Sequence, residues 1–215
     1  MDVRLSRIHY PVTTLGPGNR VGIWFQGCSI RCPGCISLDT WSFDGDETKI
    51  SDVIEAIEPW LQTADGVTIS GGEPFDQPKQ LKCILEQLRT LLRTGDILVY
   101  SGYPLGSIQS HLDQMSGLID ALITEPFIKK EKQTLPLRGS DNQILHMLTA
   151  VGQKRYYGLS DTSMNQGKTL DIMFDGENTA WIAGIPQRGD LDLLVKLLHT
   201  QGVEALTTED IGGRQ

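Results

Sequence analysis

The chain has 215 residues, of which 39% are hydrophobic and 21% are charged, and its formal net charge is −8. This composition is typical of one globular domain with a sizeable core. The acidic balance argues against general binding of nucleic acid or of anionic membranes. No apolar run approaches the roughly 20 residues that cross a bilayer, and the N-terminal residues lack a secretory signal. We therefore expect a cytoplasmic protein that binds neither nucleic acid nor membrane.

The hydrophobic pattern over the first two thirds of the chain predicts strands that alternate with helices. Strands are expected at 21–26, 67–70, 97–100 and 118–124, and helices at 51–61, 78–93 and 108–115. Asp52 and Glu55 give the first helix a start that resembles a capping box. Such alternation predicts parallel strand pairing with helices covering the sheet. The expected fold class is therefore α/β with a mostly parallel sheet.

The last third of the chain predicts a small extension. Residues 170–174 and 179–185 flank a turn at 175–178 and read as a hairpin, and a helix follows at 191–199 with Gly202 beyond its end. We expect residues 1–160 to form the main domain and residues 161–215 to pack on it. The extension is interpreted as an extra layer that closes the exposed edge of the sheet; a surface for partner docking is the alternative.

Three loops follow predicted strands directly. They are the cysteine loop Cys28–Cys35, the Gly-Gly-Glu-Pro turn at Gly71–Pro74, and Ser101–Tyr103. In α/β folds with parallel strands the reactive loops gather at the carboxyl ends of the strands. We therefore expect these three loops to meet at one rim of the sheet.

The cysteine spacing points to a metal centre. Cys28, Cys32 and Cys35 fall within eight residues, and in a reducing compartment clustered thiols bind metal more often than they form disulfides. A [4Fe–4S] cluster normally takes four cysteines, so three would leave one iron open to a small molecule. The remaining cysteine, Cys83, lies in a predicted helix opposite the leucine stripe and is a poor fourth ligand.

Two other interpretations of these cysteines are open. Zinc could be held with a histidine as the fourth ligand, although no histidine has the short spacing of zinc fingers. The Cys32-Pro-Gly-Cys35 run could also be a redox dithiol, which would leave Cys28 without a role.

The combination of Cys-x3-Cys-x2-Cys after one strand and Gly-Gly-Glu-Pro after the next resembles the radical S-adenosylmethionine (radical SAM) superfamily. Further runs resemble the glycyl-radical activating enzymes, in particular those of anaerobic (class III) ribonucleotide reductase. These runs are 16–20 (Gly-Pro-Gly-Asn-Arg), 25–28 (Phe-Gln-Gly-Cys), 32–35 (Cys-Pro-Gly-Cys), 40–41 (Thr-Trp), 100–103 (Tyr-Ser-Gly-Tyr) and 138–143 (Arg-Gly-Ser-Asp-Asn-Gln). The resemblance covers about residues 5–150 and, loosely, also 184–186 (Gly-Ile-Pro). The chain departs from that subfamily at Thr124-Glu125, where an Asp-Gly pair is usual, and in its greater length.

The resemblance implies a partial (β/α) barrel that binds a [4Fe–4S] cluster and S-adenosyl-L-methionine. It implies that Cys28, Cys32 and Cys35 ligate iron. It also implies cofactor-binding roles for Ser70, Gly71, Gly72, Glu73, Pro74, Ser101, Arg138 and Asn142. The implied activity is one-electron cleavage of S-adenosylmethionine, followed by abstraction of hydrogen from a glycine of a partner glycyl-radical enzyme. The implied electron donor is a flavodoxin or a ferredoxin.

Some roles stay open at this point. Ser101 could be a simple turn residue, and Ser140 or Asp141 could cap a helix that contains His146 and Met147. Trp24 and Trp41 are expected to shield the cluster from water. A radical SAM enzyme with another small-molecule or peptide substrate is the second functional hypothesis, and a non-catalytic iron–sulfur or zinc protein is the third.

Overall fold

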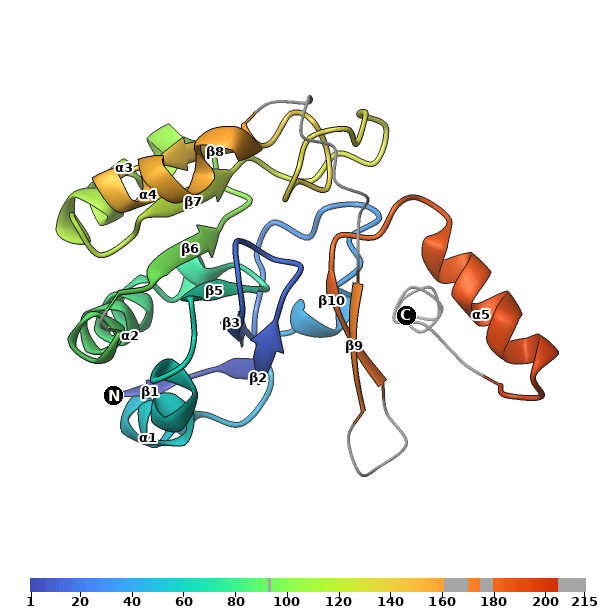
Figure 1. The fold of residues 1–215 in the computed structure, drawn as a ribbon, viewed down its shortest axis with the longest axis horizontal. Helices are drawn as coiled ribbons and strands as arrows, with labels where there is room; N and C mark the ends of the chain where they lie inside the picture. Colours follow the sequence, from blue (N-terminus) through green and yellow to red (C-terminus); the bar gives the residue numbers. More distant parts are fainter. Residues whose placement is uncertain (93, 161–169, 175–179, 205–215) are drawn as a thin grey trace.

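The computed structural model describes residues 1–92, 94–160, 170–174 and 180–204. A six-stranded sheet runs through the molecule in the order β2-β3-β5-β6-β7-β8 (Figure 1). Its strands are β2 (Leu5–Val12), β3 (Arg20–Phe25), β5 (Gly66–Gly71), β6 (Asp96–Tyr100), β7 (Ala121–Thr124) and β8 (Ile144–Met147). The four inner strands are parallel to one another, and β2 and β8 pair antiparallel at the two edges. The sheet is thus mixed, with a parallel centre as the sequence predicts.

Five α-helices and four further strands complete the described part of the chain. The helices are α1 (Ile50–Leu61), α2 (Pro78–Leu91), α3 (Leu105–Gln114), α4 (Ala150–Tyr156) and α5 (Asp190–Thr200). The strands form two separate pairs, β1 (Asp2–Val3) with β4 (Thr48–Lys49) and β9 (Leu170–Phe174) with β10 (Ala180–Gly184). None of the helices in the described ranges is long and apolar enough to cross a membrane.

The two faces of the sheet differ because successive side chains of a strand point to opposite sides. One face is apolar: Ile23, Ile69 and Ile97 are fully buried and pack against helices α1, α2 and α3. Burial of each such side chain contributes on the order of 2 kcal/mol. This face forms the main core and holds the strands in place for the loops at their carboxyl ends.

The opposite face carries a buried ionic network. The Arg20 guanidinium lies 2.8 Å from the Asp96 carboxylate, and neither side chain is exposed to solvent. Tyr156 donates a hydrogen bond to the same carboxylate, and Arg155 forms an ion pair with it from α4. Arg20 Nε also donates to Thr68 Oγ1 at 2.6 Å. The network therefore ties β3, β5, β6 and α4 together near the amino-terminal ends of the strands, away from the loops at their carboxyl ends.

Three local predictions were wrong. The segment after Gln143 forms strand β8, not a helix, because Leu145 is buried beside β7 while Ile144 is 49% exposed, which is a two-residue period. Ser140 and Asp141 therefore cap no helix. Helix α1 begins after Lys49 without a side-chain cap, so the expected capping box is absent there.

The C-terminal extension has the predicted hairpin and helix, although the predicted turn at 175–178 lies outside the described residues. Strands β9 and β10 do not join the six-stranded sheet but form their own pair. Met173 and Ala183 are buried against Trp24, Val12 and Leu15, on the side of the sheet away from the main core. Within the part of the chain that the structure describes, the extension covers a face of the sheet and does not pair with its edge.

We predict that Asp96→Ala lowers the free energy of unfolding by about 3–5 kcal/mol, because the buried Arg20 would lose its counter-charge. The matched control is Glu86→Ala, which breaks an exposed ion pair with Lys82 on α2 and should cost no more than about 1 kcal/mol. Denaturant unfolding of the cluster-free protein measures both. Equal losses in the two variants would contradict a structural role for the buried network.

Candidate functional site

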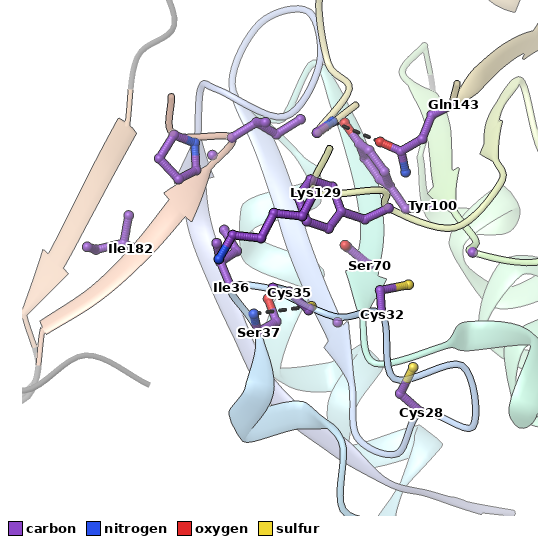
Figure 2. A pocket seen from close by; sticks show the side chains of 18 of the residues that line it. Cys28, Cys32, Cys35, Ile36, Ser37, Ser70, Tyr100, Lys129, Gln143 and Ile182 are labelled. Carbon is purple, nitrogen blue, oxygen red and sulfur yellow. Dashed lines mark hydrogen bonds between the residues drawn. The ribbon is translucent and has the colours of Figure 1, made fainter. Parts of the chain in front are cut away.

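A cavity of about 390 Å³ lies at the carboxyl ends of strands β3, β5 and β6. The cysteine loop, the Gly-Gly-Glu-Pro turn and the Ser101 loop all contribute to its wall, as the sequence predicts. Their residues at the cavity include Cys28, Cys32, Cys35, Gly71, Glu73 and Ser101. Figure 2 shows the three cysteines on one loop of this wall. Trp24 and Trp41 also line the cavity, and their shielding role stays a prediction.

The cysteine loop has an unusual backbone. Gly27 (φ 100°), Arg31 (φ 50°) and Gly34 (φ 79°) adopt left-handed conformations, which cost little for glycine and more for arginine. Gly27 N–H donates to the Thr40 carbonyl and Cys28 N–H to the Trp41 carbonyl. These bonds close the loop onto the short helix at Leu38–Thr40 and fix the direction in which the three thiols point.

Burial raises the pKa of all three thiols. Backbone N–H groups oppose this effect: those of Arg31 and Ile30 favour the thiolate of Cys28, and that of Ser37 favours the thiolate of Cys35, with an N–Sγ distance of 3.4 Å. N–H donors aimed at cysteine sulfur stabilise negative charge on a metal-bound thiolate and tune cluster potential. The backbone N–H groups thus offset part of the effect of burial, and the pKa of each thiol stays above its usual value.

The donor set fits an iron–sulfur cluster with three protein ligands. All three cysteines are free thiols on one loop. Across the described residues, no three His, Cys, Asp or Glu side chains are gathered closely enough to hold a single metal ion. None of the four histidines of the chain lines the cavity. Cys83 is remote from the cavity on α2, where it packs against the main core.

The two glycines of the turn are required by close backbone contact. A Cβ on Gly71 would stand 2.3 Å from the Phe25 nitrogen, and a Cβ on Gly72 would stand 2.1 Å from the Gly27 carbonyl oxygen. Both distances are far below van der Waals contact. Gly72 N–H donates to the Phe25 carbonyl and Glu73 N–H to the Gly27 carbonyl, each at 2.8 Å. The turn thus lies directly on the backbone that leads into the cysteine loop.

Glu73 is almost fully buried, and its carboxylate joins the turn to the loop after β6. It accepts hydrogen bonds from Phe75 N at 2.9 Å, Ser101 Oγ at 3.0 Å and Gly102 N at 2.7 Å. Burial nevertheless dominates and raises the pKa of Glu73 to about 7. Ser101 is thus both a turn residue and a partner of Glu73, because its Oγ also accepts from Tyr103 N.

The structure divides the other expected cofactor residues into two groups. Ser70 lines the cavity together with the glycines, whereas Pro74, Arg138 and Asn142 do not. Arg138 is buried and donates to the Leu159 carbonyl, and Asn142 donates to the Pro126 carbonyl at 2.8 Å. These contacts anchor the segment 126–143, which borders the cavity through other residues.

Of these other residues, Gln143 belongs to the run 138–143 that the sequence analysis singled out, whereas Lys129 and Gln133 were not singled out from the sequence. Lys129, Gln133 and Gln143 line the cavity, and Figure 2 shows the Lys129 side chain extended across it. Lys129 Cδ lies 2.7 Å from the point where a Cβ on Gly34 would stand. Glycine before the third cysteine therefore leaves the space that the Lys129 stem occupies. No signal in the sequence links these two positions, which are far apart along the chain.

We predict that Glu73→Gln makes stability less dependent on pH. The pKa of Glu73 rises from 4.5 to about 7 on folding, so the native state binds the extra proton between these values and stability falls as the pH rises through that window. Across this pH range the free energy of unfolding of the wild type falls by up to roughly 3 kcal/mol. Denaturant unfolding of the cluster-free protein at pH 5 and pH 8 measures this effect. The free energy of unfolding of the variant, relative to that of the wild type, should be higher at pH 8 than at pH 5. Glu55→Gln on the exposed face of α1 is the control, and a variant-to-wild-type difference that is the same at both pH values would contradict the assignment.

The model of the family described as "4Fe-4S single cluster domain" matches residues 14–146. The chain is 32% identical over 149 residues to the anaerobic ribonucleoside-triphosphate reductase-activating protein of Escherichia coli K12, covering 65% of this chain and 96% of that protein. The activating protein of Vibrio cholerae is 29% identical, with 66% and 96% covered, and that of bacteriophage T4 is 25% identical, with 60% and 85% covered. The chain therefore belongs to the 4Fe-4S single cluster domain family and, within it, to the anaerobic ribonucleoside-triphosphate reductase-activating proteins.

Proposed function

We propose that this protein is a radical SAM activating enzyme that generates a glycyl radical on an anaerobic ribonucleotide reductase. The observation that carries the proposal is that three free thiols and the Gly-Gly-Glu turn line one cavity in a member of the activating-protein family. Cys28, Cys32 and Cys35 hold a [4Fe–4S] cluster, with one iron left for S-adenosylmethionine. When bound and reduced, the cluster supplies the electron that cleaves S-adenosylmethionine to methionine and a 5′-deoxyadenosyl radical, which takes hydrogen from the partner's glycine.

The protein's own residues position and enclose this chemistry. Ser70, Gly71 and Gly72 form the side of the cavity next to the cysteine loop and bind the methionine end of the cofactor, and the absence of side chains at the glycines lets this turn lie directly against the backbone of Phe25 and Gly27. The hydrogen bond between Ser101 and Glu73 holds the turn after β5 and the loop after β6 together. In its ionised form, Glu73 also offers a carboxylate to the ammonium of the methionine moiety.

Pro74, Arg138 and Asn142 do not line the cavity, and in this proposal they position the segments that do. Pro74 begins the short helix Pro74–Asp76, which directs the turn away from the cavity. Arg138 and Asn142 hold the segment that contributes Gly139 and Gln143 to the cavity wall. In this proposal they maintain the shape of the adenosine side of the site.

The fold supports a partial (β/α) barrel of the radical SAM type. Four parallel strands have helices α1, α2 and α3 on one face, and the cavity opens at their carboxyl ends on the other. Residues 1–160 would be the barrel domain and residues 161–215 its extension. A cytoplasmic flavodoxin or ferredoxin is the proposed electron donor, and neither nucleic acid nor membrane is a partner in this proposal.

We predict that Cys28→Ser, Cys32→Ser and Cys35→Ser each abolish cluster assembly, because each removes one of three protein ligands. Anaerobic reconstitution of the wild type should yield about four irons per chain, measured by iron analysis and visible absorption. Cys83→Ser is the matched control and should assemble as the wild type does. Zinc in place of iron, or normal iron content in a variant of the triplet, would reject the cluster assignment.

We further predict that the reduced wild-type protein releases 5′-deoxyadenosine from S-adenosylmethionine and, mixed with anaerobic ribonucleotide reductase, produces a glycyl doublet in electron paramagnetic resonance. Cys35→Ser should give neither product. Release of 5′-deoxyadenosine without a glycyl signal on the reductase would favour the alternative function, a radical SAM enzyme with a different small-molecule or peptide substrate. No 5′-deoxyadenosine under strong reductant would leave the non-catalytic alternative.

A further inference from the structure

The C-terminal extension contributes a whole side of the cavity that contains the cysteines. Residues Ile182 to Gly189, which run from the end of β10 to the residue before α5, line the cavity, and so do Leu191 and Asp192 in the first turn of α5. Figure 2 shows Ile182 on the hairpin, across the cavity from the cysteine loop. This segment, here called the hairpin wall (Ile182–Asp192), lies beyond the part of the chain that the family model matches. The cavity is therefore assembled from the family domain and from a segment outside it.

The hairpin that carries this wall is fixed through its first strand, β9, to the residues that follow β2. The Asp171 carboxylate accepts hydrogen bonds from the backbone N–H and the hydroxyl of Thr13, both at 2.7 Å, and from the same groups of Thr14 at 3.2 and 2.9 Å. Four hydrogen bonds to one carboxylate make a charge-assisted anchor, which is stronger than a contact between neutral groups. The hairpin is thus held in one position relative to β2.

Two further contacts fix the wall near the cysteine loop. The Arg7 guanidinium lies between two indole rings, 5.4 Å from the centroid of Trp24 and 4.7 Å from that of Trp181, a cation–π arrangement. Gln133 Nε2 donates to the Pro186 carbonyl at 2.8 Å. Strand β10, which leads into the wall, is therefore bound to β2 and β3 through Trp181, and the wall itself is bound to the segment after β7 through Pro186.

The chemistry of the wall differs from that of the opposite side. It presents aliphatic side chains, among them Ile182, Ile185 and Leu191, together with the backbone of Gly184. Its polar side chains, Gln187, Arg188 and Asp192, are exposed at the rim. An apolar centre with a polar rim is the usual anatomy of a site that receives a polypeptide.

The groups proposed for the cluster and for the methionine end all belong to the family domain. The wall is therefore free to contact the second occupant that the proposed function requires, the polypeptide that carries the target glycine. Glycine has no side chain, so its segment must be recognised through backbone and through neighbouring side chains. An apolar wall facing the cysteines across one continuous cavity suits that task.

We propose that the hairpin wall binds the glycine-bearing segment of the partner reductase and positions it against the cysteine side of the cavity. This inference rests on the proposed function. It assigns to the extension a role in choosing the protein substrate, and it makes Leu191 a positioning residue that contacts the partner and not the cluster.

The test compares two leucines in the first turn of α5. Leu191 lines the cavity, whereas Leu193 is 57% exposed and does not; two residues correspond to 200° around a helix, so they face opposite ways. Leu191→Asp should raise the dissociation constant for anaerobic ribonucleotide reductase about tenfold or more, because a carboxylate would enter an apolar contact. Leu193→Asp should leave that constant within about twofold of the wild type. Binding is measured anaerobically on the reconstituted proteins, with iron content and helicity checked in each.

The outcomes separate this inference from the proposed function. Equal dissociation constants for the two variants, or a weaker affinity of Leu191→Asp for S-adenosylmethionine with unchanged affinity for the reductase, would overturn the assignment of the wall. Failure of the wild type to bind iron or to cleave S-adenosylmethionine would instead overturn the proposed function. If Leu191→Asp loses helicity, Leu191→Ala is tested in its place. A dissociation constant for the reductase at least a few times larger than that of the wild type would support the assignment of the wall, and an unchanged constant would overturn it.

Discussion

The functional site depends on the direct contact between two backbones. The Gly71-Gly72 turn lies against Phe25 and Gly27 so closely that neither glycine has room for a Cβ. Two backbone hydrogen bonds of 2.8 Å hold the turn there. Because Cys28 follows Gly27 directly, this contact sets where the cysteine loop begins relative to the end of β5. A larger side chain at either glycine would separate the cysteines from the turn that completes their cavity.

Charged side chains are buried at two places, within the sheet and at the cavity, and they are compensated in different ways. The Arg20–Asp96 pair lies within the sheet and is compensated by Tyr156 and Arg155. A compensated buried pair adds little net stability, but loss of one partner is costly, so the network fixes the geometry of the strands. Glu73 lies at the site itself and has hydrogen bonds but no cationic partner in the part of the chain described here. Its raised pKa is the consequence.

Much of this arrangement could be predicted from the sequence because it is local. The cysteine spacing, the glycine pair and the alternation of apolar residues each lie within a few positions of one another, and the parallel order of β3, β5, β6 and β7 follows from their helical connections. Strand β8 was missed because a segment of four residues has too few positions to distinguish a two-residue from a helical period. Lys129 was missed because its partner Gly34 is remote in sequence.

The sequence by itself predicted the three thiols as ligands, and it determined the turn that approaches them and the α/β class, since each follows from residue type and short spacing. Only the tertiary structure decided that Glu73 is held by Ser101 and Gly102, that Arg138 and Asn142 lie behind the cavity wall, and that the extension supplies the side facing the cysteines. These facts depend on contacts between segments far apart along the chain. Such contacts are set by packing and hydrogen-bond satisfaction over the whole fold, for which a single sequence contains no local pattern.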